Sequence, residues 1–371
     1  MRLLIAQTTL TEALQAASYF TPNTTLSNIP PAVRLLAEGN EVYISCGSFD
    51  HSFECHLSAE IIETGESLIP YRIFSEVVRR LPPGSLLLSM DQEHGFLSIS
   101  QGNSSYNLNV LSPESPIPTE GPQSYEYKVQ LSSADFRRLV TSTSFAASTD
   151  QSREVMTGVS ISWENQWLSM AAIDGVRLAY NRIDPGSAPP KELLAVVPAK
   201  TLNDVARLAA EKESVELEFS DRKVGFIAGN YKVTSRTLEG KFPAYKEIMK
   251  FEQGTKIELD SASFMSALER VSLFSKDPDK AVLIEVQPEK IVLGSRSQEV
   301  GSAKEELPAT VSGDLMRISF NARYLIEGIK AAGEEKVALI LTGPASKALV
   351  HAPASEKSND YRYVLMPLRM Q

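Results

Sequence analysis

The sequence predicts an α+β protein built from three similar units. Three stretches each combine a short β-like entry, a Pro or Asn, and apolar residues at helical spacing: "LIPYRIFSEVVRRLPP" (68–83), "VVPAKTLNDVARLAA" (196–210) and "ISFNARYLIEGIKAA" (318–332). Each pattern is that of an amphipathic helix of about three turns. Because these stretches recur at a spacing of roughly 120–130 residues, we interpret the chain as a triplication.

A second set of helices is expected before the first set. The stretches "TTLTEALQAAS" (8–18), "SSADFRRLVTSTSFA" (132–146) and "DSASFMSALERVSLFS" (260–275) each open with Thr, Ser or Asp, which are residues that cap helix N-termini. Apolar residues then follow at spacings of three and four. In the first set, Pro70 and Pro198 are expected in the first helical turn, where a missing N–H costs little.

Strands are expected after each helix of the first set. Apolar and polar residues alternate there, as in "SVELEFSDRKVGFIAGNYKVTSRTL", and the alternation is interrupted by Gly, Asp and Asn, which is typical of antiparallel hairpins. Pro-rich or Gly-rich joins, "LSPESPIPTEGPQ" and "LEGKFPAYKEIMKFEQG", separate the units. The predicted domains are residues 1–122, 123–250 and 251–371.

The composition excludes several classes of protein. With 371 residues, 43% hydrophobic and 22% charged, the chain is long enough for two or three domains and too apolar to be disordered. No apolar run approaches the roughly eighteen residues of a membrane span, and the start "MRLLIAQTTL" has no cleavage-like segment. Two cysteines indicate a reducing compartment, so we expect a cytoplasmic protein. The net charge of −9 argues against a broadly basic surface that holds nucleic acid.

The predicted helices nevertheless carry positive charge. Counted over the six helices, taken as 8–18, 71–82, 132–146, 198–210, 260–276 and 320–332, eleven bases stand against seven acids, which gives 11 − 7 = +4 and leaves −9 − 4 = −13 for the rest of the chain. For any single helix, a solvated helix face is the better explanation. Across all six, the count indicates a basic surface within an acidic body. The eleven bases are Arg72, Arg79, Arg80, Arg137, Arg138, Lys200, Arg207, Arg270, Lys276, Arg323 and Lys330.

Signals of catalysis are weak throughout the chain. The stretch "CGSFDHSFECH" gathers two cysteines and two histidines, but their spacing matches no zinc motif and they alternate like two strands and a turn. No phosphate-binding loop or dinucleotide fingerprint occurs, and no cofactor or metal is expected. The "IDGVRL" segment is most simply a tight hairpin turn. A hydrolase that uses Asp174, Arg177 and His51 is a weaker alternative, and we expect no enzyme.

The last residues, "YRYVLMPLRMQ", are unusually apolar. Terminal residues are normally polar, because few neighbours offset the entropy lost when they become ordered. An apolar tail on an acidic protein therefore needs a partner, either within the fold or outside it.

Several of these stretches together resemble a known family. "DGVRLA" and "EGKFPAYKEIM" in the second unit, "SFNARYL" in the third and the "YVLMPLRM" ending, in this order and spacing, are similar to the bacterial DNA polymerase III β subunit, the sliding clamp. The resemblance covers essentially the whole chain. It implies a head-to-tail homodimer in which two copies form a ring of six similar domains, with helices lining the hole and antiparallel sheets outside. Such a ring encircles double-stranded DNA and tethers the replicative polymerase; a clamp loader and other replication and repair proteins are further partners.

The resemblance also implies which residues act. The basic helix residues Arg72, Arg79, Arg80, Arg137, Arg138, Lys200, Arg207 and Arg323 would face DNA. At the dimer interface, Tyr106 and Leu108 would meet Leu273 and Phe274, while Asn103 and Ser105 replace the bases that the family often pairs with acids there. A groove for partner peptides would be lined by Arg153, Met156, Ile173, Gly175, Arg177, Leu178, Pro243, Ile248, Val364, Met366, Pro367, Leu368 and Arg369.

One alternative from a different class stays open on the sequence. A three-domain scaffold that binds peptides without encircling DNA would also explain the apolar tail and the weak catalytic signals. It does not explain the basic helices.

Overall fold

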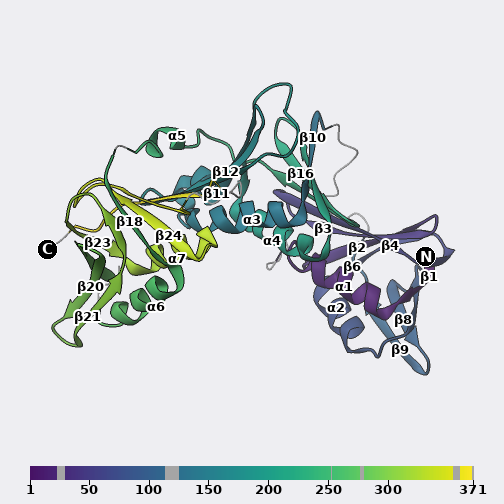
Figure 1. Cartoon of the computed structure of the whole chain (residues 1–371). Coiled ribbons are helices and arrows are strands. Elements are labelled where there is room, and N and C mark those ends of the chain that lie inside the picture. The colour runs from purple at the N-terminus through teal and green to yellow at the C-terminus, as the bar shows by residue number, and fades with distance from the viewer. Residues whose placement is uncertain (23–29, 113–124, 252, 276–279, 354–359, 370–371) are drawn as a thin grey trace. The chain divides into compact units, whose positions relative to one another are not determined.

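The structure is a computed structural model that describes residues 1–22, 30–112, 125–251, 253–275, 280–353 and 360–369. Its contacts divide the chain into two compact units. The first unit holds 1–134 and 204–237, and the second holds 135–203 and 238–371. Both combine helices with antiparallel sheets (Figure 1), which confirms the predicted α+β class. The boundary cuts through the predicted central domain because the strands of that domain belong to different sheets.

The first unit contains two antiparallel sheets. A five-stranded sheet has the order β5-β1-β7-β8-β9, and an eight-stranded sheet has the order β10-β15-β16-β17-β4-β3-β2-β6. The second sheet joins strands of the predicted first and central domains, because β17 pairs with β4 in the register Val233↔Phe53. The strands are β1 (Arg2–Ala6), β2 (Ala32–Glu38), β3 (Glu41–Gly47), β4 (His51–Ser58), β5 (Glu60–Glu63), β6 (Gly65–Pro70), β7 (Ser85–Asp91), β8 (Phe96–Gln101), β9 (Ser104–Asn109), β10 (Tyr127–Ser132), β15 (Ser214–Phe219), β16 (Lys223–Ala228) and β17 (Tyr231–Arg236).

Two helices of this unit lie side by side, α1 (Gln7–Ala17) and α2 (Tyr71–Arg80) (Figure 1). Helix α2 buries Phe74 and Val78, which are four residues apart and so share one face. Pro70 lies one residue before α2, not in its first turn as predicted. Helix α1 begins at Gln7, whose buried side-chain amide donates to the Val78 carbonyl at 2.8 Å and thereby links the two helices.

The second unit also contains two antiparallel sheets. A nine-stranded sheet has the order β14-β11-β12-β13-β26-β25-β24-β18-β22, and a four-stranded sheet has the order β21-β20-β19-β23. The nine-stranded sheet joins strands of the predicted central and third domains. The strands are β11 (Gly158–Glu164), β12 (Trp167–Ile173), β13 (Arg177–Ile183), β14 (Leu193–Pro198), β18 (Thr255–Asp260), β19 (Ala281–Gln287), β20 (Lys290–Ser297), β21 (Gly301–Pro308), β22 (Thr310–Ser312), β23 (Arg317–Asn321), β24 (Lys336–Leu341), β25 (Ala348–His351) and β26 (Arg362–Leu365).

Helices α6 (Ser261–Ser272) and α7 (Ala322–Ala332) pack together in this unit (Figure 1). Asp260 caps α6 by accepting from the Ser263 N–H at 2.7 Å, as the sequence predicted. Helix α7 is capped in the same way by Asn321. The remaining helices are α3 (Ser133–Thr143), α4 (Ala199–Leu208) and α5 (Tyr245–Ile248), with 3-10 turns η1 (Ser144–Ala146), η2 (Gln151–Thr157) and η3 (Ala209–Glu211).

The six predicted long helices are therefore all present, with ends that shift by a few residues. The predictions over 132–146 and 198–210 each turn out to be an α-helix that tightens into a 3-10 turn at its end. In the part of the chain that the structure describes, no helix is long and apolar enough to span a membrane.

The cysteine-rich stretch forms the predicted two strands and a turn, β3 and β4. Cys46 lies opposite Phe53, and Cys55 lies opposite Ile44. Both thiols are buried and form no disulfide, and burial raises the pKa of each to about 12. They are therefore packed in the sheet as protonated, unreactive side chains.

Candidate functional site

Strand β26 explains why the end of the sequence is apolar. It lies between β13 and β25, so that Val364 is opposite Leu178 on one side and Leu349 on the other. Tyr363, Val364 and Leu365 are each no more than 2% exposed. A strand that is paired on both edges and buried on both faces has an apolar sequence without polar alternation.

The residues after β26 are held by backbone hydrogen bonds on two sides. The Met366 N–H donates to the Val176 carbonyl at 2.9 Å, and the Leu368 N–H donates to the Ser319 carbonyl at 2.8 Å. The Met366 side chain is 45% exposed and Arg369 is exposed, while Pro367 and Leu368 are half-buried. The segment thus has a fixed backbone and presents apolar side chains to solvent. Met370 lies outside the described residues.

The "IDGVRL" segment forms the expected tight turn, which joins β12 to β13. The Asp174 carboxylate accepts from the backbone N–H groups of Val176 and Arg177 at 2.9 and 3.0 Å. Gly175 has φ +102°, a conformation that favours glycine. The Arg153 guanidinium lies against Gly175, 3.5 Å from where a Cβ would be. The predicted site residues Arg153 and Gly175 are therefore neighbours.

Arg177 is the centre of a buried polar network. Its guanidinium donates to Asp174 Oδ2 at 2.8 Å, to the Phe145 carbonyl at 2.8 Å, and to Glu327 on α7. It also stacks over the Tyr324 ring, 4.1 Å from the centroid. Burial alone lowers the pKa of Arg177, but the hydrogen bond to Glu327 and the nearby Tyr363 and Asp174 outweigh it and raise the pKa overall. Arg177 therefore stays charged, and it links the β12–β13 turn to α7.

One apolar cluster contains five of the predicted groove residues: Met156, Ile173, Leu178, Ile248 and Val364. Four of these are buried, and Ile248 is partly buried at the edge. The cluster also contains residues that the sequence analysis did not single out, although two of them lie in the quoted "EGKFPAYKEIM" stretch. These residues are Ala171, Tyr180, Val196, Phe242, Tyr245 and Leu349.

The short helix α5 places Ile248 beside this cluster. The Lys347 ammonium donates to the carbonyls of Ile248 and Lys250 at 2.6 and 2.8 Å, and it lies 4.7 Å from the centroid of the Phe251 ring. These bonds satisfy carbonyls at the end of the helix that would otherwise lack partners. Pro243 precedes α5 and is half-buried. The structure thus brings five of the predicted groove residues into one apolar cluster, and the role of all the predicted groove residues in binding stays a prediction.

The predicted DNA-facing bases are exposed, except for the half-buried Arg138, and most of them pair with an acid on the same helix. Arg79 and Arg80 share Glu76 at 2.9 and 3.0 Å. Three further pairs, Arg138–Asp135, Arg207–Asp204 and Arg323–Glu327, have distances of 2.9 to 3.0 Å. Arg72 and Arg137 are exposed and form no ion pair with any residue that the structure describes, and Lys200 is also exposed. Exposed ion pairs are weak, so phosphates can compete for these bases, except at Arg207, whose partner Asp204 is buried. Lys276 lies outside the described residues.

The predicted interface residues differ in exposure. Leu273, after α6, is 73% exposed, and Tyr106, on the edge strand β9, is 41% exposed. Phe274 is half-buried. Leu108 is only 8% exposed, because it already packs inside its own unit. Leu273 and Tyr106 are thus available for contact, whereas Leu108 can lose little further surface.

The residues of the alternative hydrolase are occupied by other contacts. Asp174 and Arg177 bond to each other and to the turn, as described above. The two ring nitrogens of His51 lie 3.3 Å from the Ser48 hydroxyl and 3.1 Å from the Phe20 carbonyl. Among the described residues, no three His, Cys, Asp or Glu side chains gather as a metal site.

Comparison with known proteins decides the family. The N-terminal, central and C-terminal domain profiles of the DNA polymerase III beta subunit match residues 1–118, 130–244 and 246–369. The beta sliding clamp of Caulobacter vibrioides is 30% identical over 376 residues, which is 100% of both chains. The chain belongs to the DNA polymerase III beta subunit family. Its function is that of a sliding clamp, which works with DNA polymerase III on DNA.

Solved structures agree with this family in fold. The structure of the C. crescentus beta sliding clamp with bound PEG has a TM-score of 0.91 and 29% identity over 100% of both chains. The DNA polymerase sliding clamp of Bacillus subtilis has a TM-score of 0.93 at 24% identity, again over 100% of both chains. The second likeness concerns the fold alone.

Proposed function

We propose that two copies of this chain close head to tail into a ring that encircles double-stranded DNA and tethers the replicative polymerase, without catalysing a reaction. The observation that carries the proposal is the pair of sheet edges, β9 and β21. Each is the last strand of its sheet, in the order β5-β1-β7-β8-β9 and β21-β20-β19-β23. Edge strands present unpaired N–H and C=O groups and are templates for pairing with another chain.

Exposed apolar side chains support the same two edges as contacts between copies. Tyr106 lies on β9, and Leu273 directly follows α6, which packs against β20 and β21. One copy would place β9 and Tyr106 against β21 and Leu273 of the next. Such a contact joins two different surfaces, and it gives a closed ring when the rotation between copies closes.

The basic helices would line the hole of this ring. Five of their arginines, Arg79, Arg80, Arg138, Arg207 and Arg323, are held by acids three or four residues away, so contacts of these bases with phosphates would be weak and readily exchanged. Weak contacts suit a clamp, because topological closure retains DNA without tight binding, whereas strong phosphate contacts would slow sliding. The net charge of −9 would keep DNA from binding the outer surface.

The apolar cluster around Val364 would take short hydrophobic segments of partner proteins. Met366, Pro367 and Leu368 would form one wall, with Leu178, Pro243 and Ile248 opposite. Methionine adapts to side chains of different shape, and proline lowers the ordering cost of binding. The C. crescentus clamp was solved with PEG at a proposed β-motif tethering region, which supports a tethering site in this family. The polymerase, a clamp loader and other replication or repair proteins would compete for it in the cytoplasm.

Retention on circular DNA tests the ring. Loaded by a clamp loader onto closed circular DNA, the protein should remain bound at about 0.5 M salt, because a topological link releases no counterions. Linearising the DNA at one restriction site should release the protein quickly. The matched control is the same linear DNA with both ends blocked by bound protein, which should retain it. Equal retention on circular and open linear DNA would refute encirclement and favour a scaffold that binds without a ring.

A further inference from the structure

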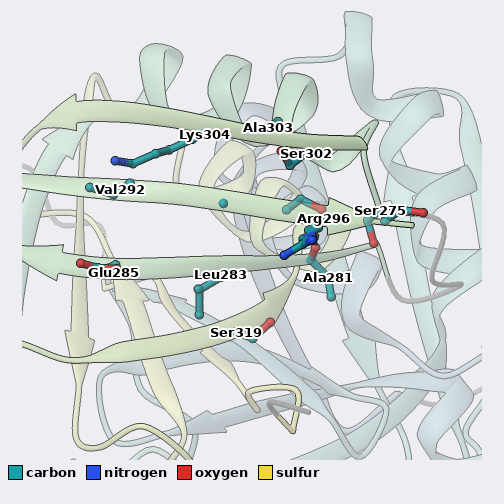
Figure 2. Close-up of a pocket in the computed structure, with 13 residues that line it drawn as sticks. Ser275, Ala281, Leu283, Glu285, Val292, Arg296, Ser302, Ala303, Lys304 and Ser319 are labelled. Carbon is teal, nitrogen blue, oxygen red and sulfur yellow. Dashed lines mark hydrogen bonds between the residues drawn. The ribbon is translucent and has the colours of Figure 1, made fainter. Parts of the chain in front are cut away.

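The four-stranded sheet of the second unit carries a hollow on one face. Its volume is about 590 Å³, a size within the ordinary range of ligand-binding pockets. Side chains of β19, β20, β21 and β23 line it. Figure 2 shows Lys304, Val292 and Glu285 at one end, Arg296 and Ser302 at the other, and Leu283 between them.

The hollow exists because Gly294 lies in the middle of β20. Gly294 is opposite Leu283 on β19 and Lys304 on β21, and both pairings run without a register shift. A Cβ added at Gly294 would meet nothing within 4 Å, and its φ is not in the left-handed region. Neither backbone conformation nor crowding therefore requires a glycine here. Glycine weakens a strand, and an interior glycine often marks close approach by a ligand or another chain.

The charges on this face are unbalanced toward the positive. Alternate residues of the four strands place four bases and two acids on it, which gives 4 − 2 = +2 in a chain of net charge −9. Glu285 pairs with Arg317 at 2.8 Å, and Glu306 pairs with both Lys290 and Lys304, at 2.6 and 3.4 Å. Arg296 is exposed and forms no ion pair with any residue that the structure describes. Of the four bases on this face, Arg296 is therefore the one whose charge is available to bind an anion.

We propose that this hollow binds an extended acidic segment of a partner protein, with one apolar side chain over Gly294 and a carboxylate on Arg296. The spacing fits such a segment. Gly294 and Arg296 are two residues apart on one face of β20, and side chains two residues apart in an extended peptide also share a face. The recognised pattern is therefore an apolar residue, any residue, then Asp or Glu. Hydroxyl groups such as that of Ser302 can form hydrogen bonds with the backbone of a bound peptide. An aliphatic acid, as an alternative ligand, has no backbone groups that would use them.

The lining of this hollow shares no residue with the apolar cluster around Val364, although the carbonyl of Ser319, which lines it, accepts a hydrogen bond from Leu368 in the proposed groove wall. The hollow is on a face of the sheet, whereas the proposed contact between copies uses the β21 edge. Its occupation could therefore add a second point of attachment for a partner that already uses the groove, which raises the affinity of the tethered pair by effective concentration.

The probe is a labelled, end-capped pentapeptide of the sequence Thr-Ile-Thr-Asp-Thr, titrated with the full-length protein and followed by fluorescence anisotropy. Binding is expected with a dissociation constant of roughly 0.1–1 mM, typical of a short peptide that pays its own ordering entropy. Replacing the peptide's Asp by Asn should weaken binding about five- to tenfold, the loss of one charge-assisted hydrogen bond. Absence of binding by the parent protein would overturn the proposal.

Two protein variants locate the peptide. Gly294→Val fills the hollow with a side chain that suits a strand, so it should raise the thermal midpoint and weaken binding at least about tenfold. Arg296→Gln should weaken the Asp peptide about five- to tenfold and leave the Asn peptide unchanged, as a double-mutant cycle requires. The matched control is Arg222→Gln, which removes an exposed arginine from the first unit and should change nothing.

Three results would contradict the assignment. Equal affinity of the Gly294→Val and parent proteins would mean that the peptide binds elsewhere. Loss of binding on replacement of Met366 by Asp would place the peptide in the tethering groove instead. Monomers of Gly294→Val in sedimentation would make the hollow a contact between copies of this chain, whereas an unchanged oligomeric state supports a separate partner.

Discussion

Leu273→Ala should weaken the proposed dimer strongly. Full burial of a leucine is worth about 1.5–3 kcal/mol. Leu273 is 73% exposed in the isolated chain, so the interface can add about three-quarters of that, or about 1.1–2.2 kcal/mol per contact. A ring of two copies contains two such contacts. Because Ala keeps only one methyl group, the dimer dissociation constant should rise about 30- to 1,000-fold.

Sedimentation equilibrium over a range of protein concentrations measures this change. The matched control is Leu194→Ala on β14, which removes a leucine that is 63% exposed but lies outside the predicted contact. Leu108→Ala is a second comparison, because Leu108 is already buried and should cost folding stability, about 2–5 kcal/mol, more than assembly. A threefold change in the dissociation constant corresponds to less than about 1 kcal/mol of binding free energy. A dissociation constant for Leu273→Ala within about threefold of the parent value would therefore refute the assignment of the interface.

The same dimer should depend little on salt. Strand β9 carries no charged residue, and the acids of β21 are already paired within the subunit. Glu305 accepts two hydrogen bonds from Arg270, at 2.9 and 2.7 Å, and Glu306 accepts one from Lys290 at 2.6 Å. Association through neutral edges lacks the ion pairs that salt screens. A steep loss of dimer between 0.05 and about 0.5 M salt would mean that charged groups form the contact after all.

Three further changes have defined outcomes. Met366→Ala removes an apolar side chain that is 45% exposed on a fixed backbone, so it should weaken a hydrophobic partner peptide about tenfold in calorimetric titration while leaving the thermal midpoint unchanged. Gly328→Ala places a Cβ 2.2 Å from the buried Tyr363 ring, so it should lower the thermal midpoint by an overpacking cost of about 1–3 kcal/mol, even though Ala is the better helix former. Burial lowers the pKa of His351 in the folded protein; Lys256 and Arg362 act in the same direction, and the Ala352 carbonyl and Glu258 oppose them. The unfolded chain therefore binds the proton more tightly than the folded protein does. The free energy of unfolding should thus fall as the pH drops below about 6.5, the ordinary pKa of histidine. Replacing His351 by Gln should flatten that part of the pH dependence in urea unfolding, and an unchanged slope would exclude His351 as its source.

The helices and hairpins could be predicted from the sequence because their signals are local. The apolar spacing of α2 and the Asp cap of α6 each lie within one turn of the element that they define. The Asp174–Gly175 turn is equally local. Such signals fix what each segment becomes, but not which segments pair.

The composition of the candidate site depended on long-range pairing and could be predicted only in part. Arg177 pairs with Glu327, which is 150 residues away in the chain, and nothing near either residue indicates the other. Leu349 joins the cluster only because β25 pairs with β26. The hollow at Gly294 was also not predicted, since an isolated glycine in a strand has several explanations until its surroundings are known.

The position of β26 connects the apolar tail to the proposed function. In the sheet order, β26 is the one strand between β13 and β25, so the nine-stranded sheet is continuous only through Arg362–Leu365. Without that strand, the sheet would separate into two parts, one that ends at β13 and one that begins at β25. The same four residues carry Val364 into the apolar cluster and hold the backbone of Met366 beside Val176. Residues that join the two halves of the sheet thus also position the proposed tethering surface. A substitution that loosens β26 should therefore weaken partner binding even where it removes no contact with the partner.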